Sequence, residues 1–341
     1  MDRTGDHPLR AGGMSDMLIE AIHGEYRECR IPGLVRTGHG TLLGYYECRD
    51  STSDWARIDL KIIRSTDGGE SWETVLLIPG EGHTLNNPVM IVDGEKIHFL
   101  FCKHYRQIFY CVSEDDGKSF SEPRLIQEPF DGIDFFYNAV AIGPGHGISH
   151  GGRLLVPVWF VYNRERPTAH HPSFVSTLCS EDGGAHWFFG ENVPSDGLID
   201  PNESALAVDA EGQVVISIRS ESSAHCRAVA RSQSGTGAWT PPKLEPHLKD
   251  PVCQGSMISR GDLLLHSNCD SDSKRKNLTI KALDRDFKVR RCLLVDEIGG
   301  YSDLAVIDDD LFVLYERGAL HGNGGMHFKS FSLVEMLDLK N

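Results

Sequence analysis

Three octapeptides in this chain share the pattern Ser-x-Asp-x-Gly-x-x-aromatic. They read STDGGESW (65–72), SEDDGKSF (113–120) and SEDGGAHW (180–187). Four fixed positions do not coincide three times by chance in a chain of 341 residues, so one structural unit is used repeatedly. A repeat constrains the fold more than any other feature, because each unit must bury its apolar face against its neighbours.

Two weaker copies continue the series. SQSGTGAW (232–239) keeps the Ser and the Trp, and ALDRDFKV (282–289) keeps mainly Asp284. A spacing near 50 residues, with alternating apolar residues between the copies, suits the four short strands of a propeller blade. At about 57 residues per blade, the whole length fits six blades. The sequence therefore predicts an all-β fold, a six-bladed β-propeller of four-stranded antiparallel blades.

The octapeptide itself reads as a turn. Asp and Ser side chains accept hydrogen bonds from nearby backbone groups, and Gly supplies a residue with positive φ. We expect the aromatic residue to pack the hairpin against its own blade, between strands at 58–65 (IDLKIIRS) and 73–78 (ETVLLI). A Ca²⁺ loop is the alternative, but the copies lack the successive Asp or Asn ligands and the closing Glu of that motif.

Composition and charge restrict the partners. The formal net charge is −15, which argues against a nucleic-acid partner because such a partner requires a basic surface. No stretch approaches the length of a membrane span, and residue spacing indicates no metal site and no cofactor. An anionic small substrate stays compatible with this charge, since a local group of arginines outweighs a distant negative surface.

The ends and the cysteines give expectations about organisation and location. Residues 1–16 read as a polar, mobile leader without the apolar core of a signal peptide, and residues 17–341 as one propeller domain. Nine cysteines without a CxxC pair are typical of free, buried thiols in a reducing compartment. We therefore expect a cytoplasmic protein, or a secreted one if the native leader is missing from this chain. The sequence gives no indication of the oligomeric state.

The segments between the octapeptides carry a second, ordered set of motifs. They are CRIP (29–32), ECRDSTSDW (47–55), NES (202–204), SIRS (217–220), RKNL (275–278), GGYSDL (299–304) and LYERG (314–318). Together with the octapeptides, known as Asp boxes, this set resembles the exo-α-sialidase (neuraminidase) family, in order and from about residue 30 to 318. The resemblance implies a six-bladed propeller with its active site at the central mouth, in agreement with the repeat.

By this resemblance three arginines bind the carboxylate of a sialic acid: Arg30, Arg219 and Arg275. Guanidinium groups suit that task because their paired N–H donors match a carboxylate, which a lysine does not. Three converging arginines repel one another, and Glu316 matches the family residue that holds the first of them. Taken alone, Arg275 also reads as part of an exposed charge run.

The resemblance also assigns Tyr301 as the nucleophile and Glu203 as its general base. Sialidases, with a tyrosine nucleophile, are one exception to the two-carboxylate scheme of glycosidases. A carboxylate that attacks a carbon already bearing a carboxylate meets like-charge repulsion, whereas a neutral phenol does not. A phenol with a pKa near 10 is weak by itself, so it needs a base in contact and cations nearby. The product is expected to retain its configuration through a covalent glycosyl–tyrosine intermediate.

Asp54 is the predicted acid/base that protonates the leaving oxygen and later activates water. Asp50 and Asp59 lie close in sequence, so the segment offers three candidates. Asp59 begins a predicted strand and reads as structural. Arg49 matches a family position and is expected to assist around the sugar ring.

The sequence does not identify which sialic acid or related sugar is the substrate. No motif identifies the pocket for the N-acyl group of the sugar, for which the candidates are Trp55, Phe135, Phe136, Tyr137 and Trp159. The prediction is a retaining exo-α-sialidase that releases terminal α-linked sialic acids from sialylated glycans or oligosaccharides. The alternatives are a glycosidase for a related nonulosonate, a trans-sialidase, including an intramolecular one, and a non-catalytic sialic-acid-binding propeller.

Overall fold

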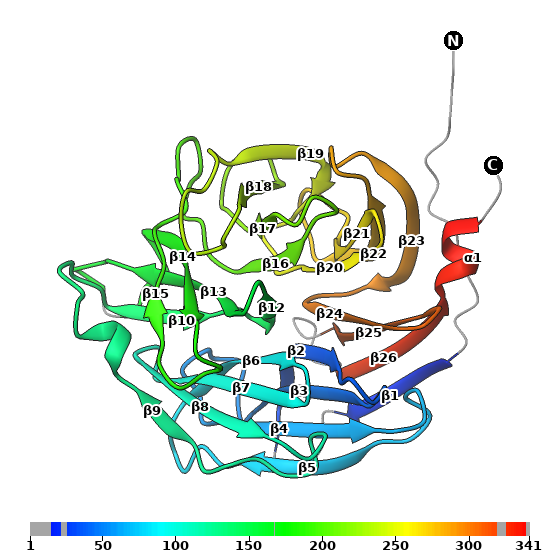
Figure 1. The fold of residues 1–341 in the computed structure, drawn as a ribbon, viewed down its shortest axis with the longest axis horizontal. Helices are drawn as coiled ribbons and strands as arrows, with labels where there is room; N and C mark the ends of the chain where they lie inside the picture. Colours follow the sequence, from blue (N-terminus) through cyan, green and yellow to red (C-terminus); the bar gives the residue numbers. More distant parts are fainter. Residues whose placement is uncertain (1–14, 22–25, 167, 319–324, 339–341) are drawn as a thin grey trace.

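The computed structural model describes residues 15–21, 26–166, 168–318 and 325–338. Besides strands, these residues form the 3-10 turn η1 (Glu128–Phe130) and the short helix α1 (Leu333–Asp338). None of the described helices is long and apolar enough to cross a membrane. The strands form six sheets around a common axis (Figure 1). The predicted all-β, six-bladed propeller is confirmed.

Blades 1 to 3 follow one another along the chain. Blade 1 consists of β2 (Glu28–Arg36), β3 (Leu42–Arg49), β4 (Ile58–Ser65) and β5 (Glu73–Ile78). Blade 2 consists of β6 (Leu85–Asp93), β7 (Lys96–Lys103), β8 (Gln107–Ser113) and β9 (Arg124–Ile126). Blade 3 consists of β10 (Ala139–Ile142), β13 (Arg153–Val161), β14 (Ser173–Ser180) and β15 (Phe188–Phe189).

Blades 4 to 6 complete the ring. Blade 4 consists of β16 (Ser204–Val208), β17 (Val214–Ile218), β18 (Cys226–Ser232) and β19 (Lys243–Lys249). Blade 5 consists of β20 (Ser256–Arg260), β21 (Leu263–Cys269), β22 (Lys276–Leu283) and β23 (Val289–Ile298). Blade 6 consists of β24 (Ser302–Ile307), β25 (Asp310–Arg317), β26 (Gly325–Ser332) and, from the other end of the chain, β1 (Ser15–Ala21).

Strand β1 closes the ring, because it pairs antiparallel with β26 (Figure 1, blue beside red). Met17 lies opposite Phe328 in this pairing. The strand begins at Ser15, so the last two residues of the predicted leader belong to blade 6. The rest of that leader lies outside the described residues.

Two blades also carry a short fifth strand near the axis. The segment after β10 supplies β11 (Gly145–His146), which pairs parallel with β6 of blade 2. It then supplies β12 (Ile148–His150), which pairs antiparallel with β13 of blade 3. Blades 2 and 3 therefore have five strands rather than the predicted four, and one segment joins them at the centre.

The hydrophobic core lies between the blades rather than inside one of them. Each large cluster of buried residues in the described chain joins two adjacent blades: Leu43 of blade 1 packs in one cluster with Phe99 of blade 2, and Leu265 of blade 5 in another with Leu304 of blade 6. The same holds for the other contacts around the ring. Burial on both faces explains why β3 has no exposed residue.

All nine cysteines are free and eight are buried, whereas the compartment stays a prediction.

The Asp boxes form the turns between the third and fourth strands of their blades. Asp67 accepts hydrogen bonds from the Ser65 and Ser71 hydroxyls and from the Ser71 N–H, at 2.6–3.0 Å. Hydrogen bonds from Ser71 lower the pKa of Asp67 to about 2. The Trp72 indole donates to the Gly69 carbonyl at 3.2 Å. The Asp67 carboxylate thus accepts its hydrogen bonds from residues of the turn itself, as predicted.

One expectation about the boxes is incomplete. Trp72 does not pack only on its own blade, since its ring meets Phe328 of blade 6 edge-on, with the ring centroids 5.2 Å apart. Trp187 of blade 3 likewise contacts Tyr110 of blade 2, at 5.8 Å. Gly69 must stay small because a Cβ there would lie 2.3 Å from the Phe328 ring. The boxes of blades 1 and 3 therefore also contact the preceding blade, which local turn chemistry does not reveal, whereas Phe120 of the second box meets Phe99 of its own blade at 6.0 Å.

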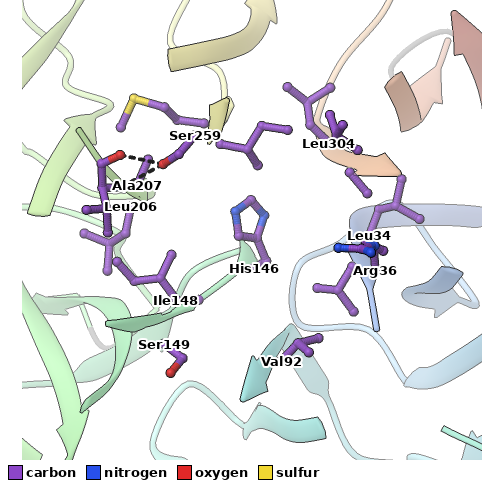
Figure 2. A pocket seen from close by; sticks show the side chains of 17 residues that line it. Leu34, Arg36, Val92, His146, Ile148, Ser149, Leu206, Ala207, Ser259 and Leu304 are labelled. Carbon is purple, nitrogen blue, oxygen red and sulfur yellow. Dashed lines mark hydrogen bonds between the residues drawn. The ribbon is translucent and has the colours of Figure 1, made fainter. Parts of the chain in front are cut away.

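The two ends of the central axis differ in character. At the end where the inner strands finish, a hollow of about 320 Å³ is lined mainly by aliphatic side chains, such as Leu34, Leu206 and Leu304 (Figure 2). His146 lies among them, and its Nδ1 is 2.7 Å from an oxygen of Asp303. The motif residues predicted for the active site occur instead around the starts of the inner strands.

Asp303 ties the blades together at the axis. Its fully buried carboxylate accepts hydrogen bonds from the Leu34 N–H of blade 1 at 2.8 Å and from the Ser256 hydroxyl of blade 5 at 2.6 Å. Burial lowers the pKa of His146, but the charge of Asp303 and its hydrogen bond raise it above the ordinary value. His146 and this carboxylate therefore form a buried hydrogen-bonded pair that supports the site above it.

Asp303→Asn is expected to lower the free energy of unfolding by about 3–5 kcal/mol. The amide N–H would face a buried donor, and His146 would lose the carboxylate to which it is hydrogen-bonded. Asp309→Asn is the control, since its ion pair with Arg260 is exposed and contributes at most ~1 kcal/mol. Denaturant unfolding measures both. Equal stability of the two variants would contradict the structural role of Asp303.

Candidate active site

The predicted site residues converge at one end of the propeller, which we call the mouth. Arg30 lies near the start of β2, while Glu203 and Tyr301 directly precede β16 and β24. Arg219 directly follows β17, which runs antiparallel to β16 and so ends at the same side. The mouth is therefore made of residues from blades far apart in sequence, brought together by the closed ring.

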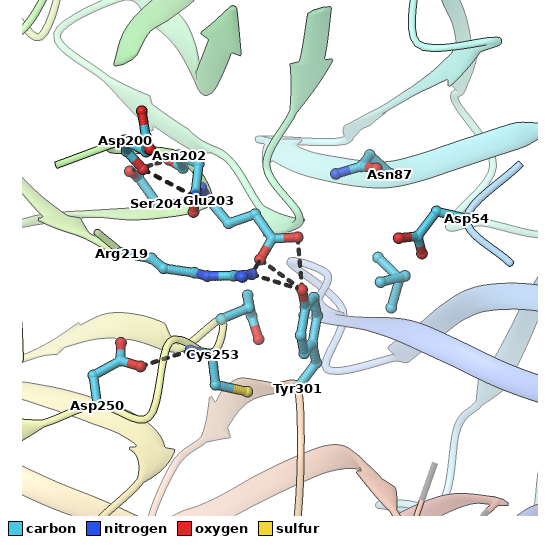
Figure 3. A network of polar contacts seen from close by, with 12 residues as sticks. Asp54, Asn87, Asp200, Asn202, Glu203, Ser204, Arg219, Asp250, Cys253 and Tyr301 are labelled. Carbon is cyan, nitrogen blue, oxygen red and sulfur yellow. Dashed lines mark hydrogen bonds and ion pairs between the residues drawn. The ribbon is translucent and has the colours of Figure 1, made fainter. Parts of the chain in front are cut away.

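Tyr301 lies at the centre of this group and is almost buried, at 5% exposure. Its O–H donates to the Glu203 carboxylate, with distances of 2.6 and 2.8 Å to the two oxygens. The Arg219 guanidinium donates to the same phenol oxygen at 2.9 Å and pairs with Glu203 (Figure 3). A phenol with a carboxylate to take its proton and a cation to stabilise its anion has the parts of an activated nucleophile.

The surroundings keep the phenol neutral at rest. Burial, and then the charge of Glu203, raise the pKa of Tyr301 above its ordinary value, against the opposing charges of Arg219, Arg275 and Arg30. Tyr301 therefore does not ionise by itself at neutral pH. Proton transfer to Glu203 must accompany any attack by its oxygen.

All three predicted arginines contact Tyr301. The guanidinium carbons of Arg30 and Arg275 lie 5.2 and 5.0 Å from the centroid of its ring. The Nε–H of Arg219 is buried and has no hydrogen-bond partner among the described residues. The structure thus places three guanidinium groups around one point, with donor capacity left for an anion.

Glu316 braces the first arginine, as the resemblance implied. The Arg30 Nε donates to Glu316 at 3.2 Å, and the Ile31 N–H donates to the same oxygen at 2.8 Å. A β-bulge between Arg30 and Gly33 gives Ile31 a φ of 58°. Gly33 is required here, since a Cβ would lie 1.9 Å from the ring of Tyr45. The CRIP motif is therefore a bulge whose residues share one buried carboxylate.

Asp54 lies across Tyr301 from Arg219 (Figure 3), in the loop between β3 and β4. Its side chain is 40% exposed and accepts a hydrogen bond from Arg49 at 2.7 Å, and Arg30 is 3.7 Å away. Burial raises the pKa of Asp54, but the charge and hydrogen bond of Arg49, together with Arg30, lower it below the ordinary value. The carboxylate is ionised at neutral pH before substrate binds.

The two neighbouring aspartates have other partners. Asp50 pairs with Arg57 at 3.7 Å, and Asp59 accepts hydrogen bonds from the Tyr26 hydroxyl and the Gly80 N–H, both at 2.8 Å. Of the three candidates, Asp54 is the one in contact with Arg30. The structure therefore favours Asp54 by position.

Arg49 differs from its expected place beside the sugar. It is 1% exposed, and its Nε donates to Glu47 at 2.7 Å while another nitrogen holds Asp54. We therefore interpret Arg49 as a positioning residue for Asp54. Sequence reasoning missed Glu47, which is fully buried and also accepts the Asn87 N–H at 2.8 Å. Its signal was available, because residues two apart on a strand lie on the same face.

The candidates for the N-acyl pocket separate into two groups. Trp55 packs on Tyr105, with ring centroids 4.9 Å apart, and His170 lies between Trp55 and Trp159. This group adjoins the segment that carries Asp54. Phe135 and Tyr137 instead pack on Phe160, at 5.4 and 5.7 Å, while Phe136 lies under the guanidinium of Arg164.

Comparison with known proteins agrees with this geometry. The profile of the BNR repeat-like domain family matches residues 73–313. A sialidase of Bacteroides fragilis is 28% identical over 90% of the chain, and an exo-alpha-sialidase of Arthroderma benhamiae is 25% identical over 86%. The chain belongs to the exo-α-sialidase family with Asp-box repeats. The predicted family, one of glycoside hydrolases, is confirmed.

Solved sialidase structures share the fold. The Hadza microbial sialidase Hz136 superimposes with a TM-score of 0.80 at 25% identity, over 92% of this chain and 67% of that one. The intramolecular trans-sialidase from Ruminococcus gnavus, at 16% identity, superimposes with a TM-score of 0.77 over 95% of this chain and 99% of that one. The chain spans 62% of the length of the B. fragilis sialidase and 78% of that of A. benhamiae.

Proposed function

We propose that this protein is a retaining exo-α-sialidase that hydrolyses terminal α-linked sialic acids. The observation that supports this most is the hydrogen-bonded group of Tyr301, Glu203 and Arg219, because it joins a nucleophile, a base and an anion-binding cation in one buried cluster. A protein that only bound sialic acid would need the arginines but not the tyrosine–glutamate pair. Relatives named as sialidases give independent support.

The three arginines bind the carboxylate on the anomeric carbon of the substrate. The guanidinium carbons of Arg30 and Arg275 lie 5.2 and 5.0 Å from the centre of the Tyr301 ring, so a carboxylate bound by these two groups brings the anomeric carbon near the phenol oxygen. The unpartnered Nε–H of Arg219 offers a further donor. Fixing the carbon in this position converts the attack into an effectively intramolecular step.

The first step forms a covalent intermediate. The Tyr301 oxygen attacks the anomeric carbon, its proton passes to Glu203, and the bond to the leaving oxygen breaks as Asp54 donates a proton to that oxygen. In the second step Asp54 takes a proton from water, the water oxygen bonds to the anomeric carbon, and the bond to Tyr301 breaks. Glu203 then returns the proton to the phenolate. Two inversions leave the α configuration retained.

Asp54 must gain a proton before it can act as an acid, which predicts an unusual pH dependence. The free enzyme holds the pKa of Asp54 low through Arg49 and Arg30, so kcat/KM for a natural sialoside is expected to fall as pH rises above that value. A bound substrate carboxylate offsets the charge of Arg30 and raises the pKa of Asp54. The decline of kcat is therefore expected at higher pH than that of kcat/KM, and coincident profiles would contradict this role.

The assay that tests the proposal uses fluorogenic α-sialosides carrying N-acetyl, N-glycolyl or deaminated sugars, with the products identified by mass. Release of fluorophore and of the free sugar acid is expected from at least one of them, and the panel also reveals which nonulosonate is preferred. No turnover of any substrate overturns the proposal. A sugar product lighter by one water would instead indicate intramolecular transfer.

A further inference from the structure

The mouth side of blade 3 carries a second hollow, of about 580 Å³, apart from Tyr301 and the arginines. Its walls include Phe135, Phe136 and Tyr162, and polar groups are supplied by Arg164, Asn192 and Ser195. This volume falls in the range of ~300–1,000 Å³ usual for small-ligand pockets, and the mixture of rings with a few polar groups is also typical of them. We call it the blade-3 hollow.

The rings of the blade-3 hollow are exposed yet held in place. Phe135, Phe136 and Tyr162 are 39%, 40% and 45% exposed. Phe135 meets Phe174 edge-on, with the ring centroids 5.3 Å apart, and the guanidinium of Arg164 lies 4.4 Å from the centre of the Phe136 ring. Apolar surface that is gathered in one place and kept in water usually marks a binding site. Because neighbouring side chains hold the rings, little ordering is needed on binding.

The hollow lies at the same end of the propeller as Tyr301. Phe135 and Phe136 shortly precede β10, an inner strand, as Tyr301 precedes β24. Tyr162 follows β13, which runs antiparallel to β10 and so ends at the mouth. The segment that follows β15 supplies Asn192 and Ser195 and continues directly to Glu203. The segment that follows β15 therefore forms one wall of the hollow and also carries Glu203 of the active site.

We propose that the blade-3 hollow binds neutral sugar rings of the glycan to which the sialic acid is attached. This rests on the proposed sialidase function and specifies its substrate as an oligosaccharide rather than a short glycoside. A sugar ring has an apolar C–H face that packs on an aromatic ring, while its hydroxyls accept from Arg164 and Asn192. A lipid chain would leave these polar groups buried without partners, which is unfavourable.

The test compares two substrates in steady-state kinetics. One is a fluorogenic sialoside whose small aglycone is too short to enter the hollow, and the other is a sialylated oligosaccharide with several neutral sugars. Phe136→Ala and Tyr162→Ala are each expected to lower kcat/KM about 10-fold for the oligosaccharide by raising KM. This is the size of effect expected when one contact between an aromatic ring and a sugar is lost. Phe188→Ala is the matched control, since that phenylalanine on β15 is 38% exposed and does not line the hollow.

A binding measurement separates this proposal from the sialidase activity. The neutral oligosaccharide without sialic acid is titrated into the intact protein and observed by ligand NMR. Saturable binding that is lost in Phe136→Ala and kept in Phe188→Ala supports the blade-3 hollow even if no sialoside is cleaved. No binding by the wild type, or equal losses of kcat/KM on both substrates, overturns the proposal. Turnover of neither sialoside, with binding intact, contradicts only the hydrolytic function.

Discussion

Replacing Tyr301 by phenylalanine is expected to reduce kcat for sialoside hydrolysis on the order of 10³-fold or more. The substitution removes the oxygen that donates to Glu203 at 2.6 Å and accepts from Arg219 at 2.9 Å. It leaves the ring in contact with Arg30 and Arg275, so the fold and the carboxylate-binding groups persist. Measurement of kcat together with the affinity for free sialic acid checks both parts.

Tyr46→Phe is the matched control for this loss. Tyr46 is also a buried tyrosine whose hydroxyl donates to a glutamate, Glu20, at 2.9 Å, but that hydroxyl does not contact Tyr301 or the three arginines. Its variant is expected to keep kcat within about 3-fold of the wild type. If Tyr301→Phe retained more than a tenth of the wild-type kcat, the phenol would not be the nucleophile.

Asp54→Asn is expected to show a loss that depends on the leaving group. For a natural sialyl oligosaccharide, without a proton donor, kcat should fall about 10²–10⁴-fold. An aryl leaving group departs without a proton, so the first step should survive while the second, which needs a base for water, stays slow. A burst of released aryl alcohol, close to one per protein molecule, is therefore expected before a slow steady state. Stopped-flow fluorescence measures it.

Asp50→Asn controls for the loss of one carboxylate from the same loop. Asp50 pairs with Arg57 near the surface and has no contact with Arg30 among the described pairs, so its kinetics should match the wild type on both substrates. An equal loss for Asp54→Asn on natural and aryl substrates, without a burst, would mean that Asp54 supports the structure instead of transferring protons.

The fold was predictable because its evidence is local and repeated. Each Asp box needs only the residues within its own octapeptide to form, and the strands at 58–65 and 73–78 were located from these turns. The pairing of β1 with β26 was not predictable in this way. Its partners lie more than 300 residues apart, and only the closed ring places Met17 opposite Phe328.

The site residues that stand in a sequence motif were predictable. The residues whose role depends on burial in the folded ring were not. Tyr301, Glu203 and the three arginines stand in motifs, and the structure brings them together. Glu47 was missed although it lies two residues before Arg49 on the same strand, because its full burial follows only from the folded ring. Phe135 and Phe136 were named from the sequence as candidates for a sugar pocket, but the blade-3 hollow itself was not predicted, since Tyr162 joins them in its wall only when blade 3 is folded.

The most direct test of the account is to trap the covalent intermediate. A 2,3-difluorinated sialic acid with a reactive anomeric fluoride forms the intermediate but slows its breakdown, so mass spectrometry of the intact and digested protein locates the bond. We predict one sugar per protein molecule, attached to the peptide that contains Tyr301, and no label on the Tyr301→Phe variant. A label on Glu203 or Asp54, or hydrolysis of the reagent with inversion at the anomeric carbon, would contradict the account.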